Sequence, residues 1–197
     1  MATNDDPRIA EVLDFWFGRP GEPTYLQTRP EWFRKDPAFD ATIRARFGPL
    51  IEDALQGRLD GWAATPQGAL ARIVVLDQFT RNTLRDSARM VAGDAQALAG
   101  ARALCDSGQD RTLPAVMRQF AYLPFEHAEN LADQQTSVRL FARLGRDDPA
   151  LQGLLEWAQK HLDIVARFGR FPHRNALLGR PSTPEEIEFL KQPGSGF

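Results

Sequence analysis

The feature that most constrains the fold is a helix-start signal that recurs along the chain. At each occurrence an Asp or Thr, which can act as an N-cap, stands directly before a proline, which is favoured at the first position of a helix. The signal is found at residues 6–7, 36–37, 65–66, 148–149 and 183–184. Apolar residues at helical spacing follow, whereas the alternating pattern of strands hardly appears. The sequence therefore predicts an all-α fold.

These starts, together with the residues that stop helices, predict helices over most of the chain. A first helix is expected from Asp6 to Gly18, and a second from Asp36 to Gly57 with a kink at Gly48-Pro49. Residues 70–79 are rich in β-branched side chains, but a capped start and the length favour a mostly buried helix. Further helices are expected over residues 94–107, 113–122 with an interruption at Pro124, around 138–144, and over 148–169 and 183–190.

The connections between the predicted helices are short, which favours antiparallel packing of each helix on the next. The expected architecture is thus a set of antiparallel helical hairpins, packed as a bundle or a short superhelix. The chain has 197 residues, of which 43% are apolar and 25% charged. This composition fits one domain, residues 1–197, with a substantial core.

The overall charge gives no reason to expect a nucleic acid or a membrane as partner. Lys and Arg number 24 and Asp and Glu 26, and no signal peptide or long apolar run is visible. The single Cys105 cannot form an internal disulfide. We expect a cytoplasmic protein that contacts neither nucleic acid nor membrane and needs no cofactor. The sequence leaves the oligomeric state open.

Two short segments concentrate polar and aromatic residues and contain two of the three histidines. Residues 122–134 are acidic, and residues 166–175 are basic. Helical scaffolding alone does not require this density of charge, so an acidic and a basic group are expected to meet in space. Whether that meeting is structural or functional is not decided by the sequence.

The basic segment is the stronger indication of a site. Gly169 can end a helix in the left-handed conformation, and Pro172 can begin a short new one, which would expose the N–H groups of His173 and Arg174 to an anion. Arginine side chains would add bidentate donors. The predicted ligand-binding residues are Gln78, Arg81, Asn82, Glu129, Arg170, His173, Arg174 and Asn175. The structural alternative is that these arginines pair with Glu126, Glu129 or Asp133 and fasten the C-terminal helices to the rest of the domain.

In the acidic segment, Glu126, Glu129 and Asp133 would share one helical face if Pro124 began a helix. His127 and Glu126 are the predicted catalytic residues, because an imidazole beside a carboxylate can serve acid–base chemistry. Neighbouring helical side chains point about 100° apart, so the two need not act together. No His-Glu-x-x-His or Glu-x-x-His spacing occurs, and no metal site is predicted.

Several segments together resemble the DUF924 family of uncharacterised, mostly bacterial proteins. They are residues 12–18, 32–36, 76–82, 122–134, 167–180 and 193–197, so the resemblance runs almost from end to end. It implies an all-α fold of the tetratricopeptide-like superfamily and no established activity. Thr80 stands where the family usually has proline, and Ala128 where serine is common, which argues against a serine nucleophile at that position.

Two functional hypotheses follow. The first is a non-catalytic binding module that captures an anionic small molecule or an acidic peptide through the predicted arginines. The second is a hydrolase-type enzyme that uses His127 or His173 as the acid or base, with arginines holding an anionic substrate. A shared cavity around the histidines and arginines would favour the enzyme, whereas a groove elsewhere would favour binding. Arginines buried against carboxylates without a cavity would contradict both site assignments.

Overall fold

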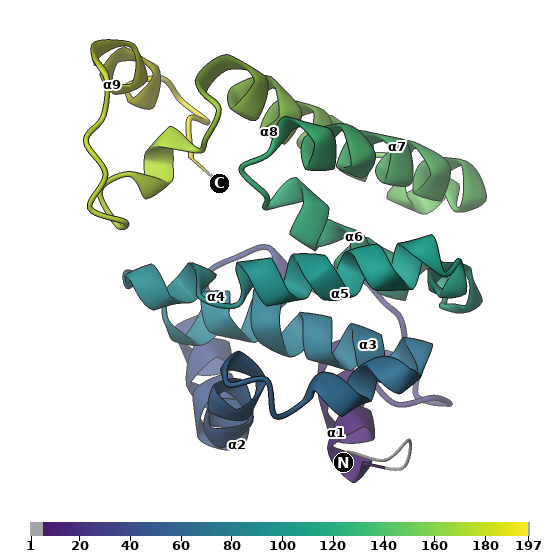
Figure 1. Cartoon of the computed structure of the whole chain (residues 1–197). Coiled ribbons are helices and arrows are strands. Elements are labelled where there is room, and N and C mark those ends of the chain that lie inside the picture. Colours follow the sequence, from purple (N-terminus) through teal and green to yellow (C-terminus); the bar gives the residue numbers. More distant parts are fainter. Residues whose placement is uncertain (1–5, 197) are drawn as a thin grey trace.

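The structure is a computed structural model that describes residues 6–196, and within these residues the chain forms helices, turns and loops but no β-strand (Figure 1). The prediction of an all-α fold is confirmed for this part of the chain. The α-helices are α1 (Pro7–Phe17), α2 (Pro37–Leu55), α3 (Pro66–Ile73), α4 (Thr80–Thr83), α5 (Asp94–Asp106), α6 (Ala115–Glu126), α7 (Leu131–Asp147), α8 (Leu154–Phe168) and α9 (Pro184–Leu190). A π-helical segment, η3 (Val74–Phe79), joins α3 to α4. The 3₁₀ turns are η1 (Pro30–Trp32), η2 (Asp60–Ala64), η4 (Ala88–Val91), η5 (Gln109–Thr112), η6 (Pro149–Leu151) and η7 (Pro172–Arg174).

The helix-start signals act as the sequence predicts. The side chains of Asp6, Asp36, Thr65, Asp148 and Thr183 each accept a backbone N–H from the turn that follows. At Asp148, however, the signal begins only the short turn η6, and α8 starts later, at Leu154. The predicted continuous helix over 148–169 is therefore wrong in its first turn.

The acidic segment does not form the single helical face that was considered for it. Helix α6 continues through Pro124 and ends at Glu126, and a loop leads to Asn130, whose side chain caps α7. The proline lacks the N–H that a helical residue donates to the carbonyl four residues earlier, yet the helix continues for two more residues before it ends. Consequently Glu126 lies on α6, Glu129 in the loop and Asp133 on α7.

Neighbouring helices pack on one another along the chain. Helix α3 packs on α5, α5 on α6, α6 on α7 and α7 on α8. Figure 1 shows α3, α5 and α6 in the middle, with α1 and α2 on one side and α7, α8 and α9 on the other. No helix among the described residues is both long and apolar enough to cross a lipid bilayer.

The apolar core is unevenly distributed. A large cluster draws on α1 to α3, η3 and α5 to α8, and its biggest fully buried side chains include Trp16, Trp62 and Phe120. A second, smaller cluster consists of Ile164, Val165 and Phe171, with Phe168 and Phe189 packed against it. The C-terminal segment after α8 has little apolar area of its own, so its polar contacts with the preceding helices contribute more to its position.

Candidate functional site

The π-helical segment η3 turns two consecutive polar side chains towards the interior. Asp77 is fully buried and Gln78 is nearly so. The amide Nε2 of Gln78 donates to Asp77 Oδ2 at 2.6 Å, and Thr80 Oγ1 donates to the Leu76 carbonyl at 2.7 Å. Interruptions of this kind in an α-helix occur frequently at functional sites. The helix predicted over 70–79 is confirmed, but nothing in its sequence indicates the π geometry.

Asp77 is the centre of a buried charged cluster. Its Oδ1 lies 2.7 Å from His127 Nδ1 and 3.0 Å from Arg81 Nη1. Burial acts to raise the pKa of the Asp77 carboxyl, but Arg81 and His127 outweigh it and hold the pKa well below its usual value. Because an ionised Asp77 can only accept, His127 Nδ1 carries the proton of this hydrogen bond and Nε2 has the lone pair.

The start of α5 brings a second carboxylate to the cluster. The backbone at Gly93 lies so close to η3 that an added Cβ would be 2.2 Å from the Leu76 carbonyl oxygen. This approach places Asp94 opposite Arg81, with Nη1–Oδ1 and Nη2–Oδ2 distances of 2.8 and 2.9 Å. Arg81 is thus held bidentately by one carboxylate while it contacts another.

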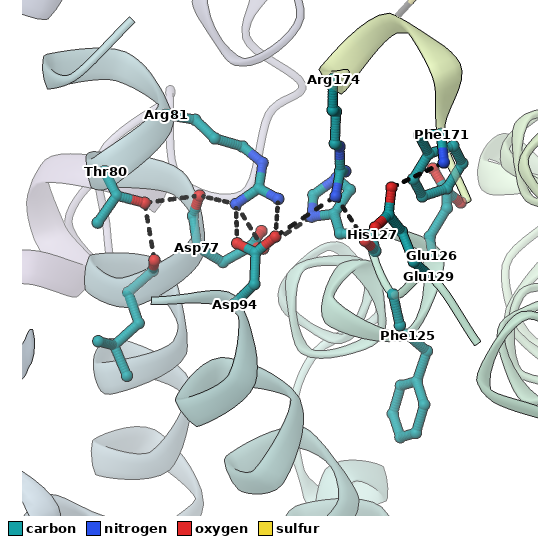
Figure 2. A network of polar contacts seen from close by, with 12 residues as sticks. Asp77, Thr80, Arg81, Asp94, Phe125, Glu126, His127, Glu129, Phe171 and Arg174 are labelled. Carbon is teal, nitrogen blue, oxygen red and sulfur yellow. Dashed lines mark hydrogen bonds and ion pairs between the residues drawn. The ribbon is translucent and has the colours of Figure 1, made fainter. Parts of the chain in front are cut away.

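Arg174 reaches the same cluster from η7 (Figure 2). Its Nη1 donates to the His127 carbonyl at 3.0 Å and lies 3.6 Å from Asp94 Oδ2. The guanidinium also stacks over the Phe171 ring, 4.5 Å from its centroid. Burial, with a contribution from Arg81, lowers the pKa of Arg174 to about 10. The nearby carboxylates therefore neutralise the positive charge of Arg174 only in part.

Glu126 and His161 complete the cluster on its α6 and α8 side. Both side chains are buried, and His161 Nδ1 lies 3.4 Å from Glu126 Oε1. Burial and the nearby Asp77 raise the pKa of Glu126 to about 8, and burial lowers the pKa of His161 to about 3. Both groups are therefore neutral near pH 7. From here on, the charged cluster means Asp77, Arg81, Asp94, Glu126, His127, His161 and Arg174.

Four of the predicted site residues have side-chain partners outside the charged cluster. Asn82 Nδ2 donates to Asp40 Oδ1 at 2.7 Å, beside α2. Arg170 pairs bidentately with Glu186, at 2.7 and 2.8 Å, and Asn175 Nδ2 contacts the same carboxylate at 3.2 Å. Glu129 pairs with Arg180, at 2.6 and 2.9 Å. The contacts of Arg170, Asn175 and Glu129 hold α9 and the segment after α8 in place. The pairs named by the structural alternative do not form, because Arg170 pairs with Glu186 and Glu129 with Arg180.

His173 lies on η7, beside the ring of Phe171 at a centroid distance of 5.7 Å. Burial and then Arg174 lower its pKa to about 4. The expected exposure of backbone donors at this turn is wrong for Arg174, because its N–H donates to the Phe171 carbonyl at 3.1 Å. The segment does begin as predicted, since Gly169 ends α8 in the left-handed conformation and Pro172 opens η7.

The structure thus brings together Gln78, Arg81, Glu126, His127 and Arg174 among the predicted site residues. Sequence reasoning missed Asp77, Asp94 and His161, which link them. Asp133, proposed as a partner for the basic segment, instead accepts from Arg102 at 2.7 Å. Within residues 6–196 no three His, Cys, Asp or Glu side chains are grouped so that they could hold a metal ion.

The chain belongs to the family described as "Bacterial protein of unknown function (DUF924)", which matches residues 12–194. It is also similar to the solved structure of a protein of unknown function from Agrobacterium tumefaciens. The two share 40% sequence identity and a TM-score of 0.82, over 94% of this chain and 97% of the other. No curated protein matches the chain. The comparisons thus establish the family and assign it no activity.

Proposed function

We propose that the protein is a binding module for a small anionic molecule or an acidic peptide, and that Arg174 holds the anionic group. The observation that carries this proposal is the incomplete pairing of a buried guanidinium. The Arg174 side chain is 11% exposed, and the carboxylate with which it pairs, Asp94, is 3.6 Å away and is already held at 2.8 Å by Arg81. An anion at Arg174 would supply the missing compensation.

The proposed site uses fewer arginines than the one expected from the sequence. Arg81 and Arg170 are each held bidentately by a carboxylate, so their donors are committed within the protein. Arg174 is held by a backbone carbonyl, an aromatic face and one long ion pair. It is the arginine among the predicted ligands that would gain most from an external anion.

We further propose that residues 1–197 form one domain of the tetratricopeptide-like kind. The packing of α6 on α7 and of α7 on α8 supports a succession of hairpins. Proteins of this architecture commonly use a concave helical surface to bind partners, which agrees with a binding role but is an analogy of fold.

An NMR titration with inorganic phosphate and with succinate, at constant ionic strength, tests the anion site. We expect saturable shifts at residues around Arg174 in the parent protein, and their loss in Arg174→Gln. Arg170→Gln is the matched control, because its guanidinium is committed to Glu186, and it should leave the titration unchanged. Urea unfolding of Arg174→Ala gives a second readout. A loss of about 3 kcal/mol or more would show that Arg174 is half of a structural ion pair and would contradict the proposal.

One observation favours the enzyme hypothesis as a second candidate. The hydrogen bond from His127 Nδ1 to Asp77 fixes the orientation of the imidazole and leaves the lone pair on Nε2, where it can accept a proton. The His127 side chain is 14% exposed. Burial lowers the pKa of His127, which keeps the imidazole neutral near pH 7. Hydrolysis of anionic p-nitrophenyl esters that is lost in His127→Gln and kept in His173→Gln would support this candidate.

A further inference from the structure

A groove lies on another part of the molecule, between α1, the loop after it, η1 and α2. Its volume is about 590 Å³, within the range of cavities that hold small ligands. The charged groups that line it include Asp14, Arg19, Glu22, Glu31 and Arg46. The groove shares no lining residue with the charged cluster, so the two are separate regions of the molecule.

The loop that forms one wall of the groove is fixed by backbone contacts. Leu26 N donates to the Phe17 carbonyl at 2.8 Å. Gly18 has a φ of +82°, and a Cβ there would lie 3.1 Å from the Thr24 carbonyl oxygen. Arg29 Nη1 donates to the Phe15 carbonyl at the end of α1, at 2.7 Å. The groove is therefore largely preformed, which lowers the entropic cost of binding there.

Charged groups of both signs are loosely held in the groove. Arg19 pairs with Asp14 at 3.5 Å. Arg46 is held more firmly, by Glu11 at 3.2 Å and over the Phe15 and Phe47 rings at 4.9 and 5.0 Å. The Arg19 side chain is 71% exposed. Among the described residues, the carboxylates of Glu22 and Glu31 have no ion pair. The Glu22 carboxylate accepts one long hydrogen bond, 3.4 Å, from the Arg19 backbone. Donors and carboxylates are thus both available to a ligand.

We infer that this groove binds a small zwitterionic ligand of the dipeptide type, with its ammonium group at Glu31 and Glu22 and its carboxylate at Arg19. A simple anion or cation entering the groove meets charges of its own sign, whereas a ligand that carries both signs complements both sets. The size of the groove exceeds that of a single ion and accommodates two amino-acid residues.

The inference is tested with three probes that differ in one charge each. Glycylglycine carries both charges, its N-acetyl derivative lacks the ammonium group, and its amide lacks the carboxylate. In an NMR titration we expect glycylglycine to shift the amide resonances around Arg19 and Glu31. Each blocked probe should bind at least about tenfold more weakly, because one charge-assisted hydrogen bond is lost.

Variants separate the two ends of the ligand. Glu31→Gln should remove the preference over the N-acetyl probe, and Arg19→Gln the preference over the amide. Arg89→Gln, on η4, is the matched control, since this exposed arginine pairs with Glu52 outside the groove and its loss should change nothing. Equal binding of all three probes, shifts confined to other surfaces, or no binding at millimolar glycylglycine would each overturn the inference. Binding in Arg174→Gln should equal that of the parent, because the two sites are independent.

Discussion

The charged cluster and the groove beside α1 contain similar kinds of side chains in very different states. In the cluster, Asp77 is fully buried, and the contacts of its carboxylate are 2.6–3.0 Å long. In the groove, the ion pairs of Arg46 and Arg19 measure 3.2 and 3.5 Å and are largely exposed. The comparison shows that a high density of charge in the sequence does not identify a binding site. A charge is committed within the protein where it is both buried and closely paired, as Asp77 is.

The physical cause of the difference is the cost of removing a charge from water. A buried carboxylate stays ionised only when cations and donors surround it, so Asp77 requires partners from several elements. Water solvates the groove residues, and their ion pairs stabilise the fold little. The same solvation leaves their donors and acceptors available to a ligand.

The largest effect on stability is expected from removing Asp77, the carboxylate at the centre of the charged cluster. Asp77→Ala leaves Arg81 and His127 without the carboxylate that they share, and we expect a loss of about 3–5 kcal/mol in the free energy of unfolding. Asp14→Ala, the matched change in the groove, should cost less than about 1 kcal/mol. Urea unfolding of the two variants beside the parent measures the difference. Similar losses for both would show that burial does not separate the two regions.

The second prediction concerns the pH dependence of the free energy of unfolding, which Glu126 affects. An unfolded Glu126 ionises near its ordinary pKa of 4.5, whereas the folded one keeps its proton up to about pH 8. This carboxyl group therefore makes the native state progressively less stable as pH rises from about 4.5 to 8. Glu126→Gln removes that dependence. Relative to the parent, the variant should gain about 2–4 kcal/mol between pH 5 and pH 8.

Glu129→Gln is the control for this pH experiment. Burial acts to raise the pKa of Glu129, but Arg180 and the Phe171 N–H outweigh it and lower the pKa. The stability that Glu129 contributes is present above its unfolded pKa and is lost as pH falls through the lower folded value. Its difference from the parent should therefore be constant between pH 5 and 8 and change only at more acid pH. A constant difference for Glu126→Gln as well would contradict the predicted state of Glu126.

Much of the fold could be predicted from the sequence because its signals are local. The Asp-Pro and Thr-Pro starts and Gly169 act through contacts within one turn, and the structure follows them. The interruption expected at Pro124 was wrong because tertiary packing can outweigh the loss of one backbone hydrogen bond, and the packing of α6 on α5 and α7 is not visible in the local sequence.

The candidate site was harder to predict because its links are distant in the sequence. His127 is 50 residues from Asp77, and the chain pattern gives no pairing between them. One signal was available. Asp77 follows the apolar run Val74 to Leu76, and a carboxylate in a segment predicted to be buried must have a partner. Asp94 resembled an ordinary residue of a first helical turn, and only the close approach of Gly93 to η3 gives it its role.

The close packing of Gly93 against η3 gives the smallest predicted effect on stability. Changing Gly93 tests whether this packing positions Asp94 in the charged cluster. A Cβ at residue 93 would lie 2.2 Å from the Leu76 carbonyl oxygen, so Gly93→Ala must move the start of α5 away from η3. We expect a loss of about 1–3 kcal/mol in urea unfolding, as for an overpacked core site. Gly100→Ala, further along α5, is the control. Its Cβ would meet only ordinary contacts of 3.5 Å or more, and a helical Gly-to-Ala change should stabilise the protein by about 0.5–1 kcal/mol. If Gly93→Ala were as stable as the parent, Asp94 would reach Arg81 without this close packing, and the charged cluster would not depend on the backbone of α5.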